Sequence, residues 1–325
     1  MLRNADVLIV GAGPVGIFQS FYLGLLGIDA ICIDEATEIG GQCMALYPEK
    51  FIYDIPSHKQ IIASELIDNL LNQAYRYRNE SDFITSVKID KITTLENEFL
   101  VEFTEGGVFK FKKIVLATGS GSILPNELNV AGSEFLTKNI HYGVKNKQIF
   151  AGKRIAIFGG GDAAIDWVLN LSEVADSITL IHRREEFRAM ESSIQEMYQK
   201  TNVKVILNAN PIEVKSSYEG IEVLLDSDTE VSKVDEILVF WGLKYNNKFV
   251  KSLDLEIKKL RIDVNPLNMQ ASKSGIYAVG DSCHYDGKMM LIMTGFSECA
   301  IVAHDVYKTL KGEKLKNFHS TSIVK

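Results

Sequence analysis

The fold is indicated by the stretch Asp6-Val7-Leu8-Ile9-Val10-Gly11-Ala12-Gly13-Pro14-Val15-Gly16. Four apolar, largely β-branched residues predict a buried parallel strand, and the glycines that follow have the spacing G-x-G-x-x-G. Phe18 to Leu26 then predicts a helix that returns to a second strand, Ile31-Cys32-Ile33, which ends in Asp34. This order of strand, glycine turn, helix and strand is typical of a dinucleotide-binding unit.

Each residue type in this motif has a physical task. Gly11 permits the tight turn, Gly13 lets backbone N–H groups approach a pyrophosphate, and Gly16 lets the helix lie close to the strand. The N-terminal end of the helix dipole favours the negative charge of the phosphates. Asp34 lies about 20 residues beyond the motif, where a carboxylate accepts hydrogen bonds from a ribose diol. The first unit is therefore expected to bind an adenine dinucleotide that lacks a 2′-phosphate.

The same plan occurs a second time in Ile155-Ala156-Ile157-Phe158-Gly159-Gly160-Gly161-Asp162-Ala163-Ala164. Here Gly159 and Gly161 are the first two motif positions, and Ala164 replaces the third glycine. The strand that follows, Ile178 to Ile181, ends in a cluster of arginines that suits a 2′-phosphate by charge and by bidentate geometry. We therefore expect NADP at this second unit, with the phosphate bound by Arg183, Arg184 and Arg188. The alternative is that these arginines are only the solvated start of a helix.

Composition limits the other classes of function. With 325 residues the chain is long enough for two domains, and a net charge of −7 argues against nucleic acid as a general partner. The uncharged run from Val7 to Ile28 is interrupted by five glycines and Pro14, so we do not expect a membrane helix. No signal peptide is apparent, which favours the cytoplasm. The cysteines form no C-x-x-C motif or metal-ligand cluster, so reduced thiols and no metal are expected at Cys32, Cys43, Cys283 and Cys299.

Between the two motifs, Gly40-Gly41-Gln42 brings backbone close to a flat or phosphorylated group. The Gln42 side chain can offer a donor and an acceptor to the edge of a heterocycle, although a glycine turn with a surface glutamine remains the alternative. Further elements expected here are a helix over 64–77, strands over 83–89, 99–104 and 108–111, and a strand that re-enters the parallel sheet over 113–119.

The C-terminal part of the sequence returns to the first domain. Gly275 to Asp281 predicts another buried strand, followed by an apolar helix over about 291–310. A sheet built only from residues before Gly119 would lack its last strand and its covering helix, so this segment belongs with the first domain. We expect an α/β fold with two Rossmann-like, three-layer ββα nucleotide-binding domains. We expect the first domain, which binds the dinucleotide without a 2′-phosphate, to be discontinuous at 1–117 and 243–325, and the second domain, 118–242, to bind NADPH.

These motifs, with Ala117-Thr118-Gly119 and Val279-Gly280-Asp281, resemble those of the two-dinucleotide flavoprotein reductases in the same order, over essentially the whole chain. In size and arrangement the chain is similar to thioredoxin reductase. However, the redox C-x-x-C of that family is replaced by His141-Tyr142-Gly143-Val144. At the other disulfide location of related reductases, Cys43 is present but Pro48 replaces its partner. Neither dithiol can form, so electrons cannot pass through an internal disulfide.

The remaining resemblance is to the thioredoxin-reductase-like (type 2) ferredoxin–NADP reductases of bacteria. It depends on Ala45-Leu46-Tyr47-Pro48-Glu49-Lys50 and on His319-Ser320-Thr321-Ser322. The resemblance implies that Tyr47 and His319 cover the two faces of the flavin ring. It also implies that Val87 and Ile123 contact FAD, although both could equally be core residues. The full set of FAD contacts implied in this way is Asp34, Gln42, Tyr47, Val87, Ile123, Asp281 and Thr321.

The resemblance further implies the activity. A hydride passes from NADPH to FAD, and the reduced flavin gives single electrons to ferredoxin or flavodoxin. A homodimer is also implied. Since ferredoxins are typically acidic and this chain is acidic overall, the docking surface must be locally basic. Candidate lysines are Lys244, Lys248 and Lys251, or Lys308, Lys311, Lys314 and Lys316.

Two other functions remain open at this point. The first is an NADPH oxidase or peroxide reductase that uses Cys43 alone as a sulfenic-acid centre, since one cysteine beside a flavin can perform that chemistry. The second is a flavin-binding sensor without enzymatic activity, which the intact NADP motif argues against.

Overall fold

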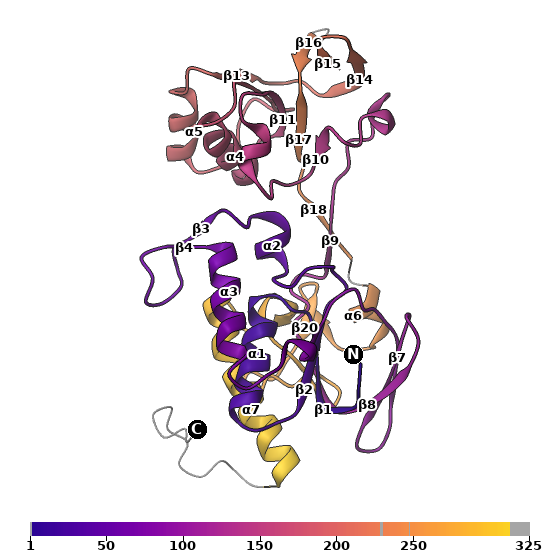
Figure 1. Ribbon diagram of the computed structural model, residues 1–325. Helices are drawn as coiled ribbons and strands as arrows, with labels where there is room; N and C mark the ends of the chain where they lie inside the picture. The colour runs from indigo at the N-terminus through magenta and orange to yellow at the C-terminus, as the bar shows by residue number, and fades with distance from the viewer. Residues whose placement is uncertain (1, 228–229, 247, 313–325) are drawn as a thin grey trace. The chain divides into compact units, whose positions relative to one another are not determined.

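A computed structural model describes residues 2–227, 230–246 and 248–312 of the chain. The chain divides into two compact units, of which unit 1 is Met1–Ser122 with Tyr245–Lys325 and unit 2 is Ile123–Lys244. The chain leaves and re-enters unit 1 through β9 (Ser122–Pro125) and β18 (Leu243–Asn246), which pair with each other (Figure 1). The assignment of FAD to 1–117 with 243–325, and of NADPH to 118–242, stays a prediction.

Strand β1 (Ala5–Val10) lies at the centre of the sheet of unit 1. It pairs in parallel with β2 (Ala30–Ile33) on one side and with β8 (Val108–Leu116) on the other. Strand β21 (Ile276–Ala278) pairs in parallel with the far side of β8, with Ile276 opposite Ile114. The expectation that the C-terminal segment supplies the last strand of this sheet is therefore confirmed. The strand order is β5-β2-β1-β8-β7-β6, where β5 is Phe83–Ile84, β6 is Ile89–Thr94 and β7 is Phe99–Phe103.

Strand β8 differs from the sequence expectation. We expected one strand over 108–111 and a second from Lys113, but the structure has a single strand of nine residues. The strand changes partners along its length, since Phe111 lies opposite Phe99 of antiparallel β7 while Lys113 lies opposite Val7 of parallel β1. The strand continues through the polar residue Lys112 because this side chain is exposed, and its ammonium group pairs with the Asp6 carboxylate at 2.7 Å. Conversely, the strand expected over 83–89 is split into β5 and β6, with Ser86 between them at a φ of +58°.

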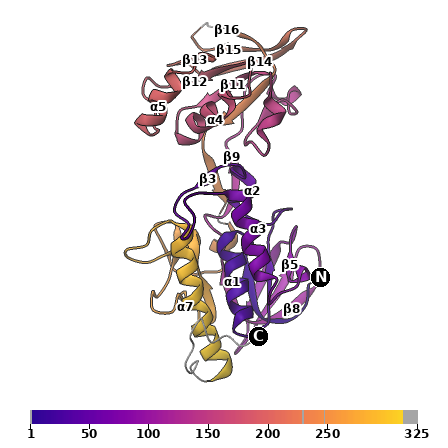
Figure 2. The same ribbon diagram turned by 60° about the vertical axis from the view of Figure 1, so that its left-hand side comes forward.

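Helices α1 (Pro14–Leu25), α3 (Ala63–Ala74) and α7 (Ile292–Lys311) lie together on one face of this sheet (Figures 1 and 2). Helix α1 begins four residues earlier than expected. Pro14 is tolerated at its first position because the N–H that proline lacks has no partner inside the helix there. The helix expected over 291–310 is confirmed as α7, which ends at Gly312 with a φ of +74°.

The other elements of unit 1 are short. Two small sheets flank the main one, with β3 paired to β4 and with the order β19-β20-β22. The bounds are α2 Gln42–Leu46, β3 Phe51–Ile52, β4 Ile61–Ile62, η1 Glu80–Asp82, α6 Lys248–Ser252, β19 Ile257–Lys258, β20 Arg261–Asp263, η4 Gly280–Ser282 and β22 Cys283–His284.

Unit 2 is built on a parallel sheet with the order β10-β17-β11-β12-β13. Apolar side chains of β11 are fully buried between this sheet and its helices. The strands are β10 Ile140–His141, β11 Arg154–Gly159, β12 Ser177–Ile181, β13 Val203–Ile206 and β17 Glu236–Phe240. The helical segments are η2 Ser133–Phe135, η3 Lys147–Phe150, α4 Asp162–Ser172 and α5 Glu191–Tyr198.

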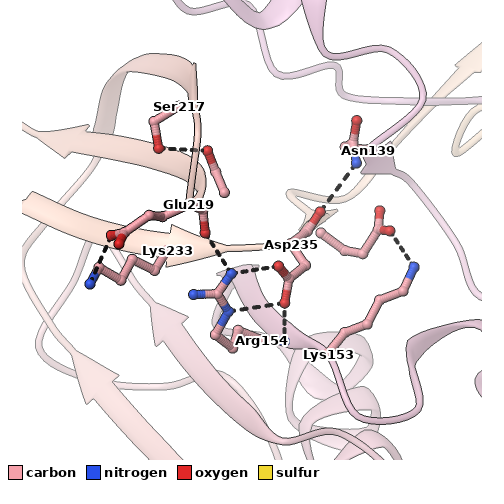
Figure 3. A network of polar contacts seen from close by, with 9 residues as sticks. Asn139, Lys153, Arg154, Ser217, Glu219, Lys233 and Asp235 are labelled. Carbon is pink, nitrogen blue, oxygen red and sulfur yellow. Dashed lines mark hydrogen bonds and ion pairs between the residues drawn. The ribbon is translucent and has the colours of Figure 1, made fainter.

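An antiparallel meander completes unit 2. It comprises β14 (Pro211–Ser217), β15 (Gly220–Leu225) and β16 (Glu230–Val234). Arg154 at the start of β11 connects the meander to the parallel sheet (Figure 3). Its guanidinium donates to both carboxylate oxygens of Asp235, at 2.6 and 3.0 Å, and to the carbonyl oxygen of Glu219 at 2.7 Å. The Arg154 guanidinium also lowers the pKa of Asp235, so this contact strengthens as the carboxylate ionises.

No helix in the described part of the chain is both long enough and apolar enough to cross a bilayer.

Candidate functional site

The three glycines of the turn between β1 and α1 have different surroundings. Gly11 has a φ of +106°, and a Cβ atom at this position would overlap the carbonyl oxygen of Ala117. A Cβ atom on Gly16 would overlap the carbonyl oxygen of Gly11. At Gly13, in contrast, the nearest protein atom to a built Cβ is the Cα of Gly41, at an ordinary 3.8 Å. Packing within the protein therefore requires glycine at positions 11 and 16. At position 13 packing does not require glycine, and the absence of a side chain leaves space for a bound ligand.

The Gly40-Gly41 segment lies against this glycine turn. The Gly40 N–H donates to the Ala12 carbonyl oxygen at 2.8 Å, which places the segment directly against the first motif. Gly41 has a φ of +55°, and its Cβ would lie 3.0 Å from the Cα of Gly13. Gln42 begins α2, and its side-chain amide lies 3.7 Å from the Cβ position of Gly119. The structure therefore brings Gln42 to the end of β8, beside the first glycine turn.

Asp34 lies at the end of β2, and backbone groups fix its carboxylate. It accepts hydrogen bonds from the N–H groups of Ala12 at 2.7 Å and of Ala36 at 2.9 Å. Burial raises the pKa of Asp34, and these two donors act in the opposite direction. The N–H of Val87 donates to the Asp34 carbonyl oxygen at 3.0 Å, and the Val87 side chain is packed in the core of unit 1.

Tyr47 follows α2 and lies near two other candidate groups. The Cys43 thiol donates to the Tyr47 hydroxyl oxygen over 3.8 Å. Burial raises the pKa of the Tyr47 hydroxyl, and the nearby Cys43 and Asp281 raise it further. The end of α2 and the η4 turn are therefore close enough to interact electrostatically. The Cys43 side chain is only 1% exposed, and burial raises the pKa of its thiol.

A pocket of about 190 Å³ opens in unit 1 at the carboxyl end of β8. The Thr118 hydroxyl oxygen is buried and has no hydrogen-bond partner within the described residues. An unsatisfied buried hydroxyl is uncommon in folded proteins, and a bound polar ligand would supply the missing partner. Together with the room left at Gly13, this fits an adenine dinucleotide. The pocket is lined by Thr118, Gly119, Ser120, Val250, Leu260, Arg261, Asp281 and Ser282.

The glycine turn of unit 2 repeats this arrangement. A Cβ atom on Gly159 would lie 2.8 Å from the Cβ of Ala164, and one on Gly160 would overlap the His182 ring. At Gly161 the nearest contact is the Arg188 carbonyl oxygen at 3.7 Å, so this position is left open in the same way as Gly13. Ala164 is fully buried where α4 packs on β11.

The predicted arginines Arg183, Arg184 and Arg188 gather beside this turn. Their side chains are exposed, and none makes an ion pair with another described residue. The Arg188 N–H donates to the Gly160 carbonyl oxygen at 2.7 Å, which fixes the segment against the turn. His182 stacks on Phe187 with ring centroids 5.2 Å apart, and its pKa is lowered by burial and then by the positive charge of Arg183, Arg184 and Arg188. The arginines predicted from the sequence therefore lie together next to the second glycine turn.

Comparison with known proteins agrees with this arrangement. The sequence matches the family of pyridine nucleotide-disulphide oxidoreductases over residues 5–299. The chain belongs to this family. It is 38% identical to a ferredoxin–NADP reductase of Neorickettsia sennetsu over 98% of each chain, and 40% identical to one of Rickettsia bellii over 99% of each. The solved thioredoxin reductase of T. acidophilum has a TM-score of 0.76 at 23% identity, over 95% of this chain and all of that one. The resemblance to two-dinucleotide flavoproteins and the α/β fold class are confirmed.

One cluster in this pyridine nucleotide-disulphide oxidoreductase was not found from its sequence. Glu298 of α7 is only 1% exposed, and its carboxylate accepts from the Gly280 N–H at 2.6 Å and from the Tyr285 hydroxyl at 2.9 Å. It also pairs with the Lys288 ammonium, so that a buried ion pair lies directly behind the η4 turn that carries Asp281. The available signal was a single acid within an otherwise apolar stretch of the helix expected over 291–310.

Some candidate residues of this family member cannot be placed. His319 and Thr321 lie outside the described residues, and so does the side chain of Ile123. All four cysteines are free, which agrees with the reduced thiols expected from their spacing, and all four are also buried. Within the described residues no cluster of histidine, cysteine or acidic side chains could hold a metal ion.

Proposed function

We propose that this protein is a ferredoxin–NADP reductase that binds FAD in unit 1 and NADPH in unit 2. The observation that carries the proposal is the pair of glycine turns, each left open at one position, Gly13 and Gly161. The first is followed by the oriented carboxylate of Asp34, and the second by the arginine cluster. The curated relatives that match the whole length of the chain carry the name ferredoxin–NADP reductase.

The residues around Gly13 would hold the FAD pyrophosphate. Helix α1 begins there without a side-chain cap, so its first N–H groups are available to an anion. The Asp34 carboxylate would accept hydrogen bonds from the adenosine ribose, and the Ala12 N–H already fixes its orientation. The buried Thr118 hydroxyl and the Gln42 amide, at the end of β8, would bind polar atoms farther along the cofactor.

The flavin ring would lie between Tyr47 and His319, which is near the C-terminus, with Asp281 accepting from a ribityl or ribose hydroxyl. Val87, Ile123 and Thr321 complete the proposed set of FAD contacts. When bound, FAD supplies the chemistry of accepting two electrons from NADPH and releasing them one at a time. The protein orients the ring through stacking, and the Cys43 thiol restrains Tyr47 through its hydroxyl.

In unit 2 the open Gly161 position and the first N–H groups of α4 would hold the NADPH pyrophosphate. The guanidinium groups of Arg183, Arg184 and Arg188 would bind the 2′-phosphate, which distinguishes NADPH from NADH. Their exposure and lack of ion-pair partners among the described residues leave their charge available to the coenzyme.

The local chemistry disfavours a peroxide reductase that depends on Cys43. Sulfenic-acid chemistry begins from an accessible thiolate, whereas this thiol is buried, has a raised pKa and donates to Tyr47. A sensor without enzymatic activity would have no use for the second glycine turn and its arginines.

The direct test is to reduce the FAD-loaded protein with NADPH under anaerobic conditions and mix it with ferredoxin in a stopped-flow instrument. We expect the visible absorbance of the oxidised flavin to return rapidly as the iron–sulfur cluster is reduced, and a preference for NADPH over NADH. Electron transfer to oxygen or peroxide only, with none to ferredoxin, would contradict the proposal.

Two matched substitutions test which nucleotide each unit binds. Because neither added Cβ meets a protein atom closely, Gly13→Ala and Gly161→Ala should both fold. We expect the first to weaken FAD binding about tenfold or more with NADP⁺ binding unchanged, and the second to do the reverse. Calorimetric titration of each nucleotide would measure both. Equal effects of the two substitutions on both nucleotides would contradict the assignment.

Three further proposals follow from the same resemblance. Flavodoxin would serve as an alternative acceptor, the protein would act in the cytoplasm, and two copies would form a homodimer. Flavodoxin can replace ferredoxin in the stopped-flow test, and analytical ultracentrifugation of the FAD-loaded protein measures the oligomeric state.

A further inference from the structure

The hairpin between β19 and β20 has an unusual turn. Lys258 lies opposite Arg261, so only Lys259 and Leu260 form the connection. Both have a positive φ, +49° and +66°. Two-residue hairpin turns with this backbone strongly favour Asn-Gly, and a bulky residue such as leucine is a rare outlier at positive φ. Strain of this kind tends to persist where a residue has a functional role.

Packing within the protein does not explain the leucine. The Leu260 side chain is 81% exposed at the tip of the hairpin, and Ile257 on the same hairpin is 44% exposed. Leu260 therefore adopts a strained backbone without burying its side chain in the described structure. An exposed apolar side chain that folding does not bury is available to a partner.

The tip itself is positively charged, whereas Glu256 and Asp263 lie at the base of the hairpin. Residues 257–261 contain Lys258, Lys259 and Arg261 and no acid, in a chain whose net charge is −7. The ammonium groups of Lys258, Lys259 and the nearby Lys251 are exposed and make no ion pair with any described residue. Helix α6, which carries Lys251, is close to the tip because Val250 and Leu260 line the same pocket.

The hairpin is attached to the proposed FAD site. Leu260 and Arg261 line the pocket that also contains Thr118 and Asp281. The Arg261 guanidinium donates to the Asp281 carbonyl oxygen at 2.9 Å, and β20 pairs with β22 directly after η4. A protein that contacted the tip would therefore lie at the edge of the pocket assigned to the cofactor.

We propose that the tip Lys258-Lys259-Leu260, together with Lys251, is the docking surface for the acidic ferredoxin. Leu260 is the apolar centre of the contact, and the lysines around it pair with carboxylates of the partner. Two acidic proteins repel each other at a distance, so a local positive patch beside the cofactor is needed for productive encounter. This inference rests on the proposed function and extends it by naming the surface.

The test uses the full-length, FAD-loaded protein and compares two double variants with the same change of charge. Lys258→Glu/Lys259→Glu should raise the KM for ferredoxin about tenfold at low ionic strength, and the difference should shrink in high salt. Lys308→Glu/Lys311→Glu, in the last turn of α7, should change this KM less than about twofold. Reduction of the bound flavin by NADPH, and turnover with ferricyanide, should be unchanged in both.

A separate variant distinguishes docking from a structural role. Leu260→Gly removes the strain at positive φ, so the protein should become more resistant to urea while its KM for ferredoxin rises. If Leu260 had only a structural role, the substitution would not raise the stability to urea and at the same time raise the KM for ferredoxin. The docking proposal is overturned if wild-type protein reduces ferredoxin but the Lys258/Lys259 variant has an unchanged KM, or if the Lys308/Lys311 variant alone is impaired. If wild-type protein reduces no ferredoxin, the proposed function itself fails, and the docking surface with it.

Discussion

Glu298→Gln is the substitution that most directly tests the support of the proposed FAD site. Glu298 and Lys288 form an ion pair whose side chains are 2% and 1% exposed. Removing the negative charge leaves the Lys288 ammonium buried without a counter-ion, which costs about 3–5 kcal/mol in other proteins. The amide also replaces one acceptor oxygen with a donor, although this carboxylate accepts from both Gly280 and Tyr285. We expect the free energy of unfolding of unit 1 to fall by about 3–5 kcal/mol.

Urea unfolding followed by circular dichroism measures this loss, and two variants serve as controls. Asp305→Asn, on the same helix, weakens a single hydrogen bond from the Tyr277 hydroxyl and should cost about 1 kcal/mol. The double variant Lys288→Met/Glu298→Gln removes both charges and should be more stable than Glu298→Gln alone, because no buried charge is left unpaired.

The same substitution should weaken FAD binding, because the Gly280 N–H loses its charged acceptor and the η4 turn carries Asp281. Fluorescence titration of the apoprotein with FAD measures this separately from stability. The reasoning is refuted if Glu298→Gln is destabilised no more than Asp305→Asn, or if removing Lys288 as well causes a further loss of stability.

Three other predictions follow from the site. Arg183→Ala/Arg184→Ala should raise the KM for NADPH by at least about 100-fold and leave that for NADH unchanged, since each of the two lost charge-assisted bonds contributes about 1.5–3 kcal/mol. Steady-state kinetics with both coenzymes measures this. Cys43→Ser should retain ferredoxin reduction within about twofold in the stopped-flow assay, because a buried thiol with a raised pKa takes no part in it, and a large loss would favour the sulfenic-acid mechanism. Burial and the arginines lower the pKa of His182 below 6.5. Unit 2 should therefore be fully stabilised above pH 6.5 and lose stability as the pH falls through the lower pKa of the folded state. NMR titration of the ring and urea unfolding against pH measure this, and a folded-state pKa at or above 6.5 would contradict it.

The sequence predicted those parts of the fold that depend on local pattern. The buried strands before Gly11 and Gly159, and the helices after them, follow from apolar runs and glycine spacing, which act within a few residues. The return of the C-terminal segment was also predictable, because a parallel strand needs a neighbour and the first unit lacked one. The continuity of β8 was not, because its two halves pair with different strands that lie far apart in the sequence.

Within the site, the sequence identified residue types better than their contacts. Asp34 was expected to meet a ribose, and its hydrogen bond to the Ala12 N–H emerges only when β2 is placed beside the glycine turn. Nothing in the sequence marked Glu298 as part of the site, because its partners Gly280 and Lys288 lie on a separate turn and loop. The strained turn at Leu260 could not be recognised, since the sequence Lys-Leu does not indicate a positive φ.

The absence of a dithiol connects these observations. The sequence has no C-x-x-C motif, and Cys32, Cys43, Cys283 and Cys299 are all buried and free. Electrons from a bound flavin would therefore leave through the protein surface to a separate carrier, and the surface beside the cofactor pocket must recognise that carrier. The C-terminal segment meets this need at two levels, because Glu298 fixes the η4 turn from behind while Arg261 connects the same turn to the basic hairpin. Glu298→Gln should therefore impair FAD binding, whereas the Lys258/Lys259 variant should impair only ferredoxin docking.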